Sequence, residues 1–150
     1  MTQVDFIELD PSVIRLQKPV LPRADQAALD DPRIRIIHQD GRRWLKDSKK
    51  YYDVILLQLP QPLNAQINRL YTLEAFQQIR DHLNPGGLFA FTLSSSENYL
   101  SSEIAYFNAS LYRTLKTVFP FVELIAGNPL LLLAGSQSFQ LNVDTLSQRY

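Results

Sequence analysis

Short apolar runs alternate with amphipathic segments along most of the chain. The run Tyr52–Leu57 is almost continuously apolar and is followed by Pro60 and Pro62, so it predicts a strand buried on both faces. Gly127-Asn128-Pro129 separates two later runs and predicts a hairpin. The predicted strands are Val4–Leu9, Arg33–His38, Tyr52–Leu57, Leu88–Leu93, Phe121–Ala126 and Leu130–Ala134.

Several segments between these runs have helical spacing. Asp10-Pro11 predicts a helix start, because an Asp cap precedes a proline at the first helical position. Thr72 is predicted to cap a helix that extends to Leu83 and ends at Asn84–Gly87. Ala24–Asp31 is predicted to be a polar connection with one helical turn. The other predicted segments are Arg42–Asp47, Ala65–Tyr71 as a helical turn or an ordered loop, Glu103–Phe119, and Val143–Tyr150 as the opening of a further helix.

The predicted elements follow the order β-α-β-α-β-α-β-α-β-β. Such alternation is typical of an α/β, Rossmann-like fold with a mostly parallel sheet and helices on both faces. The terminal hairpin makes the last strand antiparallel. The chain has 150 residues, which suits one domain. Ligands of such sheets bind beyond the carboxyl ends of the strands, so Gln58 and Gln61, after the third strand, are candidate site residues.

Composition narrows the classes of function. Fifteen basic and fifteen acidic residues cancel, which argues against a nucleic-acid partner or an anionic membrane surface. The chain has no cysteine, which excludes thiolate catalysis and thiolate metal sites. His38 and His82 have no partners at metal-ligand spacing, so we expect no metal. No apolar run approaches the ~20 residues of a membrane span, and we expect a soluble, cytoplasmic piece.

Five short motifs, in order, resemble the spermidine/spermine synthase family. That family has the fold of class I S-adenosylmethionine-dependent methyltransferases, with a terminal antiparallel strand. The resemblance implies an aminopropyltransferase of polyamine metabolism. The motifs are Glu8 at the end of a strand, Asp40-Gly41 after the next, Tyr52–Ile55 opening a third, Leu70–Phe76, and Leu83–Gly87.

The resemblance implies a site for decarboxylated or intact S-adenosylmethionine. It assigns the ribose hydroxyls to Glu8, and a carboxylate can accept from two hydroxyls at once. It assigns the adenine amino group to Asp40, with Gly41 allowing close approach. A nucleoside and a polyamine are therefore the expected small-molecule partners.

The remaining positions depart from the family pattern. Gln58, on the cofactor side, and Gln61, in the substrate pocket, stand where the family has two aspartates, and Tyr71 stands near an aromatic of the amine pocket. An amide can neither take a proton from an amine nor balance its charge. We therefore expect no confident catalytic residue and no aminopropyl transfer by this chain. The segment also resembles a family branch fused to membrane-spanning regions, so the chain could be the soluble part of a membrane-attached protein.

Compared with the family, the sequence begins at what would be the second strand and contains no G-x-G-x-G, so it lacks the first strand and its Gly-rich turn. Gly86-Gly87 follows a predicted helix rather than a strand. We interpret residues 1–150 as one incomplete domain excised from a longer protein. The Val4 and Tyr52 strands would each lack a neighbour, so they would pair directly or be completed by a second copy. Three functions stay open: a transferase completed by other parts, a non-catalytic nucleoside-binding module, and a structural domain. An S-adenosylmethionine-dependent methyltransferase-like activity is a further alternative.

Overall fold

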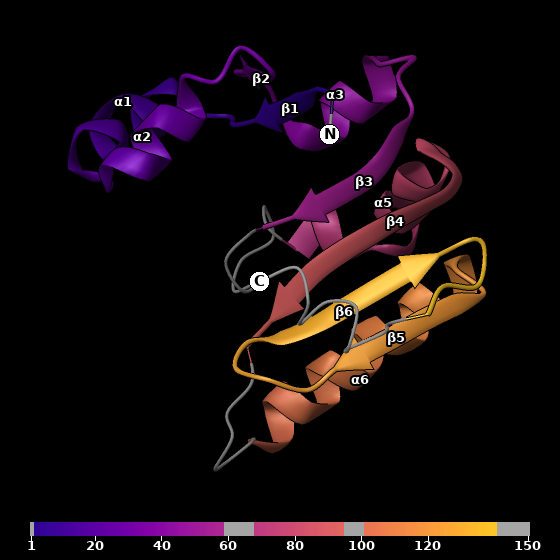
Figure 1. Ribbon diagram of the computed structural model, residues 1–150. Coiled ribbons are helices and arrows are strands. Elements are labelled where there is room, and N and C mark those ends of the chain that lie inside the picture. Colours follow the sequence, from indigo (N-terminus) through magenta and orange to yellow (C-terminus); the bar gives the residue numbers. More distant parts are fainter. Residues whose placement is uncertain (1, 59–67, 95–100, 141–150) are drawn as a thin grey trace. The chain divides into compact units, whose positions relative to one another are not determined.

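The computed structural model describes residues 2–58, 68–94 and 101–140. The chain divides into two compact units, Met1–Lys49 and Lys50–Tyr150, and each is described by itself (Figure 1). The expected segment Val143–Tyr150 lies outside the described residues. Within the described ranges, no helix combines the length and the apolar character that crossing a membrane requires.

The first unit is built on two parallel strands, β1 (Val4–Ile7) and β2 (Ile34–Ile37). Between the strands the chain forms two helices, and Asp10 caps the first by accepting the Ser12 N–H at 2.8 Å. The polar connection predicted to hold one turn contains the seven-residue helix α2 instead, because its alanine-rich sequence favours a helix throughout. The helical segments of this unit are α1 (Pro11–Gln17), η1 (Lys18–Val20), α2 (Arg23–Leu29) and α3 (Gly41–Asp47).

The second unit contains a four-stranded sheet of order β3-β4-β6-β5. Strands β3 and β4 are parallel, and β6 runs antiparallel to both β4 and β5, which confirms the predicted terminal antiparallel strand. The strands are β3 (Tyr52–Leu57), β4 (Leu83–Leu93), β5 (Phe121–Ile125) and β6 (Leu130–Gly135). The helical segments are η2 (Arg69–Tyr71), α5 (Leu73–Arg80) and α6 (Ser102–Val118).

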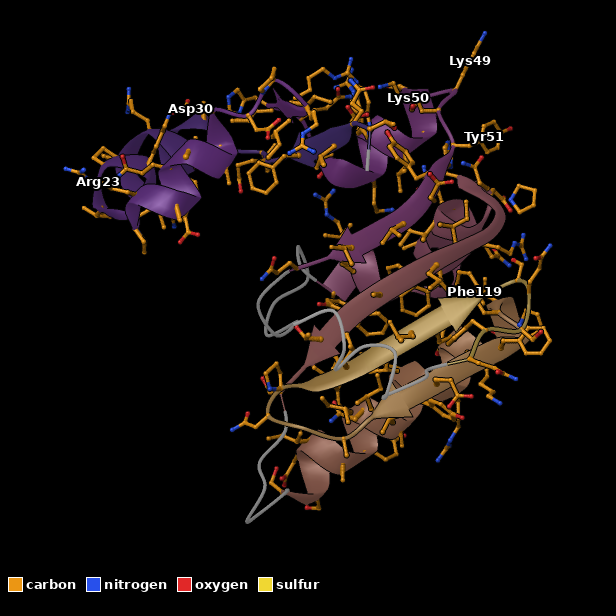
Figure 2. The ribbon with its side chains drawn as sticks, viewed as in Figure 1. Arg23, Asp30, Lys49, Lys50, Tyr51 and Phe119 are labelled. Carbon is orange, nitrogen blue, oxygen red and sulfur yellow. The ribbon has the colours of Figure 1, made fainter. Side chains whose placement is uncertain are left out.

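An aromatic cluster forms the core of this unit. Phe76 of α5 lies 5.8 Å from Phe89 and 5.9 Å from Phe91 between ring centroids, and both partners belong to β4. Phe119, which is labelled in Figure 2, lies directly after α6. Its ring stacks on that of Phe89, with ring centroids 6.0 Å apart. The same clustering of apolar side chains buries Leu115 and Leu132 completely, at 0% exposure.

In the part of the second unit that the structure describes, α5 and α6 lie on one face of the four-stranded sheet, and helices on both faces stay a prediction for the whole fold. Figure 1 shows α5 and α6 together behind the sheet. The strand registers place Val54, Leu56, Phe121 and Ile125 on the other face, where they are 54%, 71%, 42% and 38% exposed. We call this the open face. Strand β3 is therefore not buried on both faces as predicted, because it lies at the sheet edge and the described helices cover one side.

The Asn84–Gly87 segment is also placed differently from the prediction. Helix α5 ends at Arg80, and β4 begins at Leu83 and includes this segment. Five residues of β4 span the distance that two residues span on β3, so the extra residues form a bulge. Gly86 adopts a φ of 80°, and a Cβ on Gly87 would lie 2.9 Å from the Asn84 carbonyl oxygen. The glycines therefore permit a bulge inside a strand.

Strands β1 and β3 belong to separate units, each described by itself, so the prediction that they pair directly stays a prediction. The described residues provide neither strand with a second neighbour: β1 pairs with β2, and β3 pairs with β4. The alternative, completion by a second copy, stays a prediction.

Candidate nucleoside site

Glu8 continues the β1–β2 ladder beyond the end of β1. Its N–H donates to the Ile37 carbonyl at 3.0 Å, and its own carbonyl lies 3.3 Å from Nδ1 of His38. Its side-chain Oε1 accepts the Asp10 N–H at 2.9 Å. A carboxylate can accept about four hydrogen bonds in all. The backbone therefore fixes the half-buried Glu8 at the strand end while its carboxylate retains acceptor capacity.

Asp40 and Gly41 lie at the corresponding end of β2, where α3 begins. Asp40 caps α3, since its Oδ1 accepts the Arg43 N–H at 3.0 Å and its carbonyl accepts the Trp44 N–H at 2.8 Å. A Cβ added to Gly41 would meet nothing within 4 Å, and the glycine has no positive φ. The fold of this chain therefore does not itself require glycine at position 41.

A charged and aromatic chain of contacts links α3 to both strands, and it was missed in the sequence. Arg35 donates from Nε to Oδ1 of Asp5 at 3.0 Å, and the Asp5 side chain is only 3% exposed. The same guanidinium lies 5.4 Å from the centre of the Trp44 ring. The alternation of Arg33–Ile37 was the available signal, because it places Arg35 on one face beside its register partner Asp5. This contact chain supports the helix whose start carries Asp40 and Gly41.

The other predicted site residues belong to the second unit. Gln58 directly follows β3 and is exposed, and Gln61 lies outside the described residues. Tyr71 is 4% exposed and packs edge to face on Phe91, with ring centroids 5.8 Å apart. Burial raises the pKa of the Tyr71 phenol above its ordinary value of 10. The amine-pocket roles of Gln61 and Tyr71 stay predictions.

The structure thus brings together Glu8, Asp40 and Gly41, because two paired parallel strands end at the same edge of their sheet. It places Gln58 and Tyr71 in the other unit. Throughout residues 2–58, 68–94 and 101–140, no three histidine, aspartate or glutamate side chains gather as a metal site would require.

A family model and curated relatives point to the same protein family. Residues 1–128 match the spermine/spermidine synthase domain. The polyamine aminopropyltransferase of Oceanobacillus iheyensis is 38% identical over 87 residues, which are 57% of this chain and 17% of that protein. The chain thus spans less than a fifth of that relative's length.

Solved structures agree on the fold. A spermidine synthase in complex with the transition-state analogue AdoDATO has a TM-score of 0.76 and 23% identity, covering 91% of this chain and 47% of that one. Human methyltransferase-like protein 13 in complex with SAH has a TM-score of 0.66 and 19% identity, covering 97% and 67%. These likenesses show a Rossmann-like methyltransferase fold. The domain match over residues 1–128 shows that this chain belongs to the spermine/spermidine synthase family.

Proposed function

We propose that this chain binds the nucleoside part of S-adenosylmethionine, decarboxylated or intact, and does not itself transfer an aminopropyl group. One observation carries the proposal: Glu8 and Asp40 stand at the carboxyl ends of two paired parallel strands. Ligands of open α/β sheets bind beyond this edge. Family membership supports this class of ligand.

The donor set fits a nucleoside. Ribose hydroxyls are hydrogen-bond donors, and the Glu8 carboxylate, which accepts the Asp10 backbone N–H at 2.9 Å, can accept further donors. An adenine amino group is also a donor, and Asp40 offers a carboxylate oxygen acceptor beside the uncrowded Gly41. The two carboxylates would hold and orient the nucleoside, while a bound sulfonium would supply the transferable alkyl group.

The residues after β3 do not support the aminopropyl-transfer step. An amine acceptor must lose a proton before it attacks, and its other cationic end needs a countercharge. Gln58 follows β3, and the sequence places Gln61 three residues later. Their neutral amides can orient a ligand by hydrogen bonds but cannot serve as base or countercharge.

Isothermal titration of the 150-residue chain tests the proposal. The titrants are S-adenosylmethionine, its decarboxylated form, methylthioadenosine and putrescine. We expect the three nucleosides to bind, putrescine to give no heat, and Glu8→Gln to weaken nucleoside binding at least tenfold. Asp25→Asn on the exposed surface of α2 is the matched control and should bind normally. Absence of heat with all three nucleosides would refute the proposal.

A further inference from the structure

The hydrogen-bond ladder between β1 and β2 stops at the edge of the sheet where the candidate nucleoside site lies. Val4 and Glu8 donate their N–H groups to the carbonyls of Arg33 and Ile37, at 2.8 Å and 3.0 Å. In a parallel pair, a residue that donates in this way accepts from the N–H two residues further along the partner strand. A continuing ladder would therefore bring the Gln39 N–H to the Glu8 carbonyl.

The chain turns at Gln39 instead, and a side chain takes over as donor. The Gln39 N–H donates back to the Ile37 carbonyl at 3.1 Å, so that carbonyl accepts from both Gln39 and Glu8. The Glu8 carbonyl lies 3.3 Å from Nδ1 of His38. A carbonyl oxygen can only accept, so Nδ1 of His38 must carry the proton. His38 therefore supplies the last hydrogen bond of the ladder.

This hydrogen bond joins the two halves of the candidate site. On the β1 side it holds the backbone of Glu8, whose carboxylate accepts the Asp10 N–H at 2.9 Å. On the β2 side it holds the turn that leads into Asp40, the N-cap residue of α3. His38 thus ties the two segments that carry the site carboxylates.

We propose that His38 is a positioning residue of the nucleoside site: its Nδ1–H, donated to the Glu8 carbonyl, fixes the spacing between the carboxylates of Glu8 and Asp40. It acts through Glu8 and not by contact with the ligand. The inference rests on the proposed nucleoside binding, but the hydrogen bond itself can be tested without a ligand.

The place of His38 separates this role from a purely structural one. The residue is exposed and is not part of a packed core, so its hydrogen bond adds little to the free energy of unfolding. A binding site, in contrast, needs its polar groups held within a fraction of an ångström of the productive geometry. Loss of the imidazole therefore lowers affinity while the fold is kept.

Titration calorimetry with methylthioadenosine tests the role. His38→Leu should weaken binding by about fivefold, the value of one ordinary hydrogen bond. His38→Asn should bind normally, because the asparagine Nδ2 can donate from the position of Nδ1. The matched control is His82→Leu, since Nδ1 of His82 lies 2.8 Å from the Gln78 carbonyl in the second unit and this variant should bind normally. Normal binding by His38→Leu, or equal loss in His38→Asn, overturns the proposal.

A double-mutant cycle shows whether His38 acts through Glu8. Adding His38→Leu to Glu8→Gln should weaken binding by less than about twofold more, because coupled residues are not additive. A full second loss in the double variant would mean that His38 acts independently of Glu8, which overturns the proposal.

Long-range ¹H–¹⁵N NMR of the imidazole, recorded without ligand at alkaline pH, tests the hydrogen bond itself. The account requires the proton on Nδ1 of His38. A proton on Nε2 overturns the positioning role even in a chain that binds methylthioadenosine. A proton on Nδ1 in a chain that binds no nucleoside would instead overturn the proposed function, and the positioning role with it.

Discussion

Replacing Gly41 with alanine separates a structural need for glycine from a functional one. An added Cβ meets nothing within 4 Å, and position 41 is the first residue of α3. Glycine within a helix is less favourable than alanine by about 0.5–1 kcal/mol. At this first position we expect the lower end, so Gly41→Ala should stabilise the first unit by about 0.5 kcal/mol.

Urea unfolding followed by fluorescence measures this change. Trp44 is the only tryptophan and belongs to α3, so its emission reports on the unit that contains Gly41. The matched control is Gly87→Ala, whose Cβ would lie 2.9 Å and 3.0 Å from the backbone oxygens of Asn84 and Tyr52. Such overpacking costs about 1–3 kcal/mol, measured by circular dichroism.

The functional half of the prediction concerns the ligand. If a nucleoside approaches Asp40 closely over Gly41, the added methyl group should weaken methylthioadenosine binding at least tenfold, or about 1.4 kcal/mol, while stability is kept. Loss of stability in Gly41→Ala would refute the structural argument. Unchanged affinity in a folded Gly41→Ala chain would refute the close approach.

Three further predictions concern the supporting structure. Phe76→Ala should destabilise the second unit by about 3–5 kcal/mol by urea denaturation, because Phe76 is 0% exposed, and a loss below 1 kcal/mol would contradict the core assignment. Arg35→Ala leaves the buried Asp5 carboxylate without this partner and should cost about 1–3 kcal/mol, with a shift in Trp44 emission. Arg33→Ala, at a solvent-exposed pair with Asp31, should leave the urea midpoint and the Trp44 emission nearly unchanged. Because the pKa of Tyr71 is higher in the native state than in the unfolded chain, the free energy of unfolding should fall as the pH rises above 10. Tyr71→Phe should make this pH dependence shallower, and an unchanged pH dependence in the variant would contradict the prediction.

Much of the fold followed from local patterns. The apolar run at Tyr52–Leu57 matches β3 in its bounds, and the Gly-Asn-Pro segment correctly gave an antiparallel hairpin. The start of β4 did not follow, because helix α5 ends at Arg80 and the bulge depends on Gly86 at a φ of 80°. The pairing of β4 with β3 and the bulge at Gly86, rather than the local Asn-Pro-Gly-Gly composition, determine where β4 begins.

The site was predictable to a similar extent. The positions of Glu8 and Asp40 at strand ends followed from their motifs, since Glu8 stands at the end of one apolar run and Asp40 shortly after the next. The pairing of Asp5 with Arg35 across β1 and β2, and its continuation to Trp44, required the register of residues thirty positions apart. The exposure of Val54 and Leu56 likewise depends on which elements cover β3, which no local pattern specifies.

Backbone amide NMR during a methylthioadenosine titration tests nucleoside binding most directly. The account predicts concentration-dependent shifts concentrated at Glu8, Asp10, Asp40 and Gly41, with a saturating curve and loss of the shifts in Glu8→Gln. A spectrum that stays unchanged up to millimolar ligand, or shifts confined to residues of the second unit, would contradict it.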